Sequence, residues 1–166
     1  MTTSKKKEKV EQDEFDLDKK VLIKNLTTWN TGFTRIETIG DVSLVPKGSV
    51  KIARSELIAQ SQNGNKSFNG TDGRGSHADI YIDDAPTRVE LGFESEDGTT
   101  RQLVFSDELV EKVFATKNFE QFKEMFDEVF VTETEKEAVV EAIGRLGIND
   151  YNKIRFTEEH TGLKIQ

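Results

Sequence analysis

The sequence predicts an α+β fold, in which a small antiparallel β-barrel or sandwich follows a flexible N-terminal arm and precedes a C-terminal helical subdomain. Three observations predict it. Hydrophobic residues alternate with a period of two from residue 21 to about residue 105, which is typical of half-buried strands. From residue 106 they recur at the spacing of amphipathic helices. The first 20 residues include 12 charged ones. We therefore expect an arm of residues 1–20, a β-rich domain of residues 21–105 with one short helix, and a helical subdomain of residues 106–166.

The predicted arm has two interpretations. Its large hydrophobic residues are Val10, Phe15 and Leu17, and so polar a segment cannot bury enough apolar surface to offset its ordering entropy. It is either a solubilising tail or an arm that becomes ordered against a partner, with Phe15 and Leu17 as anchors. If the arm is disordered in the isolated protein, deletion of residues 1–20 should leave the melting temperature nearly unchanged.

The first half of the β-rich domain alternates hydrophobic and polar residues in short runs. This alternation predicts strands over residues 21–26, 33–38, 42–45 and 50–52. Pro46-Lys47-Gly48 supplies a turn before the last of them, because proline and glycine favour turn conformations. Ser55 then has the position of an N-cap, and residues 56–62 form a short helix that ends at Asn63-Gly64.

A glycine-rich loop of residues 67–76 separates these strands from a second group. The second group is predicted over residues 78–82, 87–93 and 100–105. Asp84-Ala85-Pro86 supplies the first turn between them, and Glu96-Asp97-Gly98 is a hairpin signal. Six or seven short strands at this spacing favour a small antiparallel barrel or sandwich.

Four amphipathic helices are predicted after residue 105. Each begins after a residue of N-cap type, namely Ser106, Asn118, Thr132 and Asn149. The most apolar stripe runs from Phe119 to Phe130. Because helices of this length are not stable alone, they must pack on one another or on the sheet. We expect the two halves to share one core, with this stripe buried in it.

Composition excludes several kinds of site. The chain has no cysteine and two histidines, which excludes disulfides, thiolate zinc sites, cysteine nucleophiles and three-histidine metal centres. Its apolar runs are far shorter than the roughly 20 residues that span a bilayer. The lysine-rich N-terminus lacks the apolar region of a secretory signal. We therefore expect a soluble, intracellular protein with no membrane partner.

The net charge of −8 is unevenly distributed along the chain. Residues 94–166 carry 17 acidic and nine basic residues, whereas residues 21–93 carry eight of each. Proteins that bind nucleic acid through its phosphates present a basic face. The distribution argues against phosphate binding by the C-terminal part and leaves room for a local basic patch in the N-terminal part.

The sequence also contains candidate contact residues in its loops. The glycines of Gly70–Gly75 have the spacing G-x-x-G-x-G, without the Gly-Lys-Ser/Thr sequence and the following helix of a phosphate-binding loop. We expect a mobile or partner-contacting loop there, with Asp72 and Arg74 as contact residues. Trp29 lies in a polar loop and is either an exposed binding anchor or an aromatic residue folded over the end of the barrel.

No set of residues indicates catalysis. His77, Asp79 and Asp83 would share one face of a strand, but a single histidine among exposed carboxylates is typical of a solvated surface. The adjacent pairs Asp83-Asp84 and Glu158-Glu159 do not converge as an acid and a base would. We therefore predict no catalytic residue, no cofactor and no metal, and we expect that the protein is not an enzyme.

Five short motifs carry a resemblance to a known group of proteins. They are Lys24-Asn25-Leu26, Pro46-Lys47-Gly48, Ser55-Glu56-Leu57, Asn149-Asp150-Tyr151 and Glu159-His160-Thr161-Gly162. On these motifs the chain resembles, over roughly residues 21–165, small proteins encoded by tailed bacteriophages of Gram-positive hosts. Such proteins are typically found with head and virion modules and carry no catalytic motif. The resemblance implies a structural role in the particle.

We accordingly expect a non-enzymatic phage structural protein, attached to the capsid or its vertices. It would be found in the virion, and in the host cytoplasm during assembly. Its expected partners are other virion proteins, the major capsid protein above all, and a homo-oligomer is consistent with this role. The expected contact residues are Phe15, Leu17, Trp29, Asp72 and Arg74.

Two other functions are open at this point. One is a nucleic-acid-associated or host-directed regulatory β-barrel protein, because small barrels bind single strands through basic, aromatic surfaces. The residues that would supply such a surface are Lys24, Trp29, Phe33, Arg35 and Lys66. No RNA-recognition or helix-turn-helix signature accompanies them, so nucleic acid is not the expected partner. The other, a small hydrolase or metal enzyme, lacks a constellation of catalytic residues.

Overall fold

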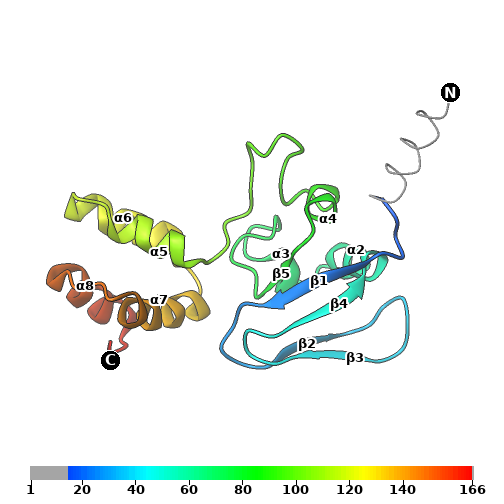
Figure 1. Cartoon of the computed structure of the whole chain (residues 1–166), viewed down its shortest axis with the longest axis horizontal. Helices are drawn as coiled ribbons and strands as arrows, with labels where there is room; N and C mark the ends of the chain where they lie inside the picture. Colours follow the sequence, from blue (N-terminus) through cyan, green and yellow to red (C-terminus); the bar gives the residue numbers. More distant parts are fainter. Residues whose placement is uncertain (1–14, 166) are drawn as a thin grey trace. The chain divides into compact units, whose positions relative to one another are not determined.

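The structure is a computed structural model, and it describes residues 15–165. These residues form two compact units, residues 15–102 and residues 103–165 (Figure 1). Every strand of the described chain lies in the first unit, whereas the second contains helices only. The predicted α+β class is therefore confirmed. Along the chain, the boundary between the units lies between residues 102 and 103. The boundary predicted from the sequence, between residues 105 and 106, is three residues later.

The strands of the first unit form two small antiparallel sheets. One has three strands in the order β4-β1-β5, and the other consists of β2 and β3. The strands are β1 (Lys20–Asn25), β2 (Thr31–Thr34), β3 (Asp41–Leu44), β4 (Ser49–Ala53) and β5 (Ile80–Ile82). In the central strand, Ile23 lies opposite Val50 on one side and Ile82 on the other. The described residues form no closed barrel, so the predicted barrel is wrong.

The two sheets contribute to one hydrophobic core. Inward residues of the strands and apolar residues of the helices beside them are nearly inaccessible to solvent, as the alternation predicts. The buried residues of this core are Val21, Ile23, Phe33, Val42, Leu44, Ile52, Leu57, Phe68, Ile80, Ile82 and Phe93. Burial of each such side chain contributes roughly 1.5–3 kcal/mol. This shared core holds the sheets together although no ladder joins them.

Three helices complete the first unit: α2 (Arg54–Gln62), α3 (Lys66–Asn69) and α4 (Ala85–Glu90). The residue before α2 is Ala53, which has no side-chain cap, so the predicted N-cap at Ser55 is wrong. The predicted strand over residues 87–93 is also wrong, because its first half is α4. The side chain of Asp84 accepts a hydrogen bond from Thr87 N at 3.1 Å and so caps this helix.

The last predicted strand of the first unit is absent as well. Ser95 N donates to Thr100 O at 2.9 Å, which closes the expected turn. Residues 101–105 then form neither strand nor helix. Without strands over residues 87–93 and 100–105, the sheet lacks the partners that closure into a barrel requires.

Part of the predicted arm belongs to the fold. Residues 1–14 lie outside the described residues, but Lys20 begins β1. Arg54 N donates to Lys19 O, and Ser55 N donates to Leu17 O, both at 2.9 Å. The prediction of a flexible arm is therefore wrong for residues 15–20, because composition does not reveal this backbone pairing. Deletion of residues 1–20 would remove these contacts, so we now expect it to destabilise the protein.

The second unit consists of four helices, and the sequence predicts all of them. They are α5 (Asp107–Phe114), α6 (Phe119–Val129), α7 (Glu133–Leu146) and α8 (Tyr151–Thr161). Ser106, Asn118 and Thr132 cap the first three as predicted, and Thr132 forms a capping box with Glu135. The last helix is capped by Asp150, not by Asn149.

The helical unit has a hydrophobic core of its own, built around phenylalanine. Phe122 and Phe126 have no exposed surface, and Phe130 is almost fully buried. Phe119, the first residue of the predicted stripe, is 39% exposed. The prediction of a buried stripe is thus confirmed except at this end. Each unit buries a cluster of residues of its own, and the core that the halves are expected to share stays a prediction.

Candidate interaction surface

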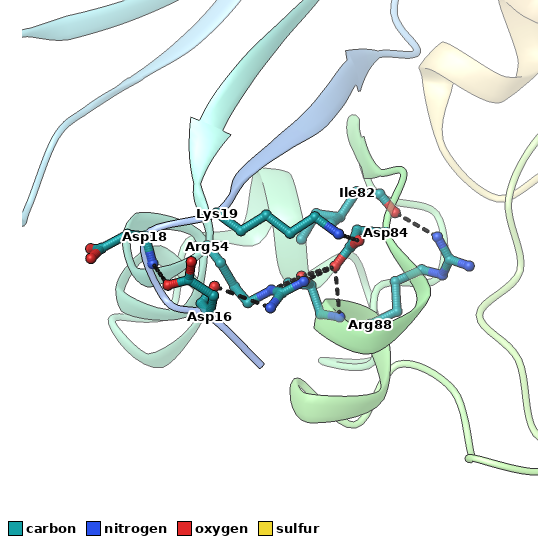
Figure 2. Close-up of polar contacts among 8 residues, drawn as sticks. Asp16, Asp18, Lys19, Arg54, Ile82, Asp84 and Arg88 are labelled. Carbon is teal, nitrogen blue, oxygen red and sulfur yellow. Dashed lines mark hydrogen bonds and ion pairs between the residues drawn. The ribbon is translucent and has the colours of Figure 1, made fainter. Parts of the chain in front are cut away.

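A buried arginine holds the N-terminal end of the described chain on the first unit. Arg54 begins α2, and its side chain is 1% exposed. Its Nε donates to Thr87 Oγ1 at 3.0 Å, its Nη2 to Asp84 Oδ2 at 2.9 Å and its Nη1 to Asp16 O at 3.1 Å. Figure 2 shows the guanidinium between Asp16 and Asp84. Three segments far apart in sequence therefore meet at one side chain.

Asp84 supplies the negative charge that a buried guanidinium requires. It also accepts hydrogen bonds from the backbone and hydroxyl of Thr87, and Lys19 Nζ lies 3.7 Å from its Oδ1. Burial alone would raise the pKa of Asp84, but hydrogen bonds from Thr87 and Arg54 and the charge of Arg54 lower it more. Its pKa therefore lies below the ordinary aspartate value, and the ionised form is favoured in the folded protein.

Residues 15–19 present two of the predicted contact residues on a fixed backbone. Besides the bonds to Arg54 and Ser55, Asp18 N donates to Asp16 Oδ1 at 2.9 Å. Phe15 and Leu17 are 52% and 51% exposed. A segment whose carbonyl groups are held by α2 thus leaves half of each apolar side chain in solvent.

The loop between β2 and β3, residues 35–40, shows the same arrangement more clearly, and we call it the tip loop. Glu56 Oε1 on α2 accepts hydrogen bonds from Ile36 N at 2.7 Å and Glu37 N at 3.2 Å. Gln60 Nε2, one turn further along, donates to Thr34 O at 2.7 Å. Ile36 is 47% exposed and Ile39 is fully exposed. Side chains of α2 therefore fix the backbone of the loop, while its two isoleucines face solvent.

Glu56 is unusual for a residue with a structural role. It is 2% exposed, and its second carboxylate oxygen, Oε2, is buried without a hydrogen-bond partner among the described residues. Leaving a buried acceptor unsatisfied costs about 1–3 kcal/mol. Glu56 therefore holds the tip loop through one carboxylate oxygen while the other is buried and unsatisfied.

Trp29 belongs to a further pair of loops that one buried residue connects. The side chain of Asn25, 1% exposed, donates to Trp29 O at 2.8 Å and to Val45 O at 3.0 Å. Trp29 is 41% exposed and Val45 is 65% exposed. Trp29 is therefore partly accessible to solvent, and both of its interpretations remain open.

The glycine-rich loop is closed by its own hydrogen bonds. Asp72 Oδ1 accepts from Arg74 N at 2.7 Å and from Ser76 N at 3.2 Å. Thr71 N donates to Ser76 O, and Gly75 N donates to Asn69 O. These four N–H groups are therefore not available to a phosphate. Burial would raise the pKa of Asp72, but the hydrogen bonds from Arg74 and Ser76 lower it below its ordinary value. The carboxylate of Asp72 thus stabilises the conformation of its own loop.

The predicted histidine and carboxylate cluster does not form on a strand. β5 begins at Ile80, so His77 and Asp79 precede it, and His77 has a positive φ of 60°. Within the described residues, no group of three or more histidine, aspartate or glutamate side chains could hold a metal ion. The predicted absence of a metal remains a prediction.

The residues that build this surface, Asn25, Arg54 and Glu56, are not among the predicted site residues. Two of them had a signal in the sequence. Asn25 continues the inward positions Val21 and Ile23, and Arg54 continues the inward position of Ile52. A polar residue in phase with buried ones indicates a buried polar group with partners to be found. Glu56 has no such signal, because its partners belong to a loop 20 residues earlier.

Comparison of the chain with protein-family models, curated proteins and solved structures finds no match. None of the helices in residues 15–165 is long and apolar enough to cross a membrane.

Proposed function

We propose that this chain is a non-enzymatic structural protein of a phage particle, attached to the capsid or its vertices. The proposed contacts are made by the isoleucines of the tip loop and by Phe15 and Leu17. The proposed partners are other virion proteins, the major capsid protein above all, in the virion and in the host cytoplasm during assembly. The sequence motifs that resemble virion-module proteins of tailed phages support the setting.

The single observation that carries the proposal is the tip loop. Ile39 is fully exposed, whereas Glu56 and Gln60, which hold the loop, are 2% and 3% exposed. Burial of an exposed isoleucine against a partner contributes roughly 1.5–3 kcal/mol. Because the loop backbone is already fixed, little conformational entropy would be lost on binding. A rigid loop that exposes apolar side chains favours a contact with another protein.

The use of the carboxylates supports a non-enzymatic role. Asp72, which is exposed, and Asp84, which is half-buried, both have a lowered pKa and both accept hydrogen bonds that fix the backbone around them. Catalytic acids require instead a pKa near the working pH and an open approach to a substrate. These groups therefore support folding and leave the surface to binding.

The experiment is co-sedimentation of the full chain with purified phage capsids. The test variant is Ile36→Ser/Ile39→Ser, and the matched control is Val131→Ser, which changes an apolar residue 46% exposed in the helical unit. We expect the test variant to bind capsids at least tenfold more weakly, a loss of about 1.4 kcal/mol, with a melting temperature close to that of the parent. The control should bind normally.

Binding that survives Ile36→Ser/Ile39→Ser would contradict a role of the tip loop, and failure of the parent chain to bind any virion protein would contradict the proposed function as a whole. The variant Phe15→Ser/Leu17→Ser separately tests the contribution of the N-terminal residues.

A further inference from the structure

The outward face of the three-stranded sheet carries a compact group of cations. Burial alternates along β1 and β4, so Lys20, Leu22 and Lys24 lie on the face opposite to the core, together with Lys51. Lys51 is paired with Leu22 and is therefore a diagonal neighbour of both Lys20 and Lys24. Diagonal neighbours on a sheet are about 7–8 Å apart. Three ammonium groups thus rise from one small area of the sheet.

Acidic residues around this area neutralise only part of its charge. Neither Lys20 nor Lys51 has an acidic partner within 4.0 Å among the described residues, and both are exposed. Lys24 Nζ lies 3.3 Å from Asp83 Oδ2, but the two side chains are 45% and 44% exposed. Exposed pairs of this kind are weak and exchange readily for another anion.

The same face also presents an aromatic ring. Tyr81 is paired with Lys24 in the register of β1 and β5. The guanidinium of Arg88 lies 5.3 Å from the centre of the Tyr81 ring, and its Nη1 donates to Ile82 O at 2.8 Å. Arg88 therefore holds the ring in place on the sheet. We call Lys20, Lys24, Lys51 and Tyr81 the platform.

We propose that the platform binds single-stranded nucleic acid, with phosphates on the three lysines and a base against Tyr81. Cationic grooves or faces with aromatic side chains are the general means by which proteins bind single strands without sequence preference. An acidic peptide would use the lysines and leave the aromatic ring without a role. The platform differs from the surface expected from the sequence, because Phe33 of that set is buried. This inference goes beyond the proposed structural function and does not depend on it.

The test is fluorescence anisotropy of a labelled 12-nucleotide oligothymidine with the full chain, titrated at several salt concentrations. Each phosphate contact on a single strand contributes about −0.7 to the slope of log K against log salt, so three lysines predict a slope of about −2. The variant Lys20→Gln/Lys24→Gln/Lys51→Gln should lose this slope and most of the affinity. The control Lys112→Gln/Lys117→Gln/Lys164→Gln removes the same charge from the helical unit and should bind like the parent.

The variant Tyr81→Leu tests the aromatic contact separately. It should weaken binding about tenfold without changing the slope, because stacking is lost and the phosphate contacts remain. Tyr81→Leu is also informative if the triple variant fails to fold. Absence of binding by the parent, equal loss in the control, or equal displacement by poly-glutamate of matched charge would each overturn the proposal. The last of these would indicate an acidic protein as the partner.

Discussion

Arg54 Nη2 lies 2.9 Å from Asp84 Oδ2, in an ion pair whose cation is 1% exposed and whose members are 30 residues apart. The same guanidinium donates to Thr87 Oγ1 and to the carbonyl of Asp16, so each of its three nitrogens makes a hydrogen bond. A charge this deeply buried is stable only while its partners remain. The side chain of Arg54 therefore contributes to the attachment of residues 15–19, together with the backbone hydrogen bonds to Lys19 O and Leu17 O.

Replacement of Arg54 by Met should destabilise the protein by about 3–5 kcal/mol, because Asp84 would remain half-buried without its buried cationic partner. Urea denaturation measures the effect. The matched control is Lys19→Met, whose ammonium is 3.7 Å from Asp84 and 48% exposed. The control should cost less than about 1 kcal/mol. Equal effects of the two substitutions would show that Arg54 does not carry the cluster.

The ion pair also predicts the response to acid. The folded-state pKa of Asp84 lies below its ordinary value, so the folded protein favours the ionised carboxylate more than the unfolded chain does. The stability that this provides is complete above the ordinary aspartate pKa of about 3.9 and is lost as the pH falls through the folded-state value. Urea denaturation from pH 7 to pH 3 should therefore show the parent approaching the variant Asp84→Asn at low pH. A constant difference between them would contradict the assignment.

Replacement of Glu56 by Ala should release the tip loop. The amides of Ile36 and Glu37 would lose their acceptor, at a cost of about 1–3 kcal/mol. Hydrogen exchange followed by mass spectrometry should show faster exchange in residues 35–40. Glu37→Ala, which removes an exposed carboxylate from the same loop, should leave the exchange unchanged. Slow exchange in the Glu56→Ala variant would mean that other contacts hold the loop.

Two phenylalanines of α6 should respond very differently to truncation. Phe126→Ala removes a side chain with no exposed surface and should cost about 3–5 kcal/mol. Phe119→Ala should cost clearly less, because Phe119 is 39% exposed and loses less buried area. Chemical denaturation of both variants checks the difference. Similar costs would mean that Phe119 is as well packed as the rest of the stripe.

Glycine is required at position 70 for more than its backbone conformation. A Cβ atom there would lie 1.9 Å from Ser76 O, and φ is +70°. At Gly64, φ is +79° but the space around a Cβ is open. Gly64→Ala should therefore cost only the strain of the left-handed conformation, about 1–2 kcal/mol. Gly70→Ala should cost more and open the loop of residues 70–76, which thermal denaturation of the two variants compares directly.

The helical unit could be predicted from the sequence because its signals are local. Each cap and the stripe behind it lie within a few residues of each other, as Thr132 and Glu135 illustrate. The β-rich unit was harder. Val89, Leu91 and Phe93 alternate like a strand, yet Val89 lies in α4, and Leu91 and Phe93 follow the end of that helix outside any strand. The sequence did contain a helix signal, because Asp84 is an N-cap residue and Pro86 follows at the second helical position. This signal outweighs a short alternation of hydrophobic and polar residues.

The interaction surface could be predicted only in part. Phe15, Leu17 and Trp29 are exposed, and nothing yet tests them as contacts. The tip loop was not predicted, because the exposure of Ile36 and Ile39 follows from a turn that Glu56 holds from another element. Hydrophobicity along a chain indicates which residues favour burial. It does not indicate which of them a distant carboxylate keeps at the surface.

The central position of β1 has a consequence for the order of events on the ribosome. β1 is synthesised before both of the strands with which it pairs, β4, which begins at Ser49, and β5, which ends at Ile82. The central strand therefore emerges long before either neighbour and must wait for both, whereas the helical unit is built from local contacts and folds quickly. Until residue 82 has left the exit tunnel, Ile23, Lys24 and Asn25 lack the partners that β5 provides in the folded protein. This interval is when the polypeptide is most open to capture by a chaperone.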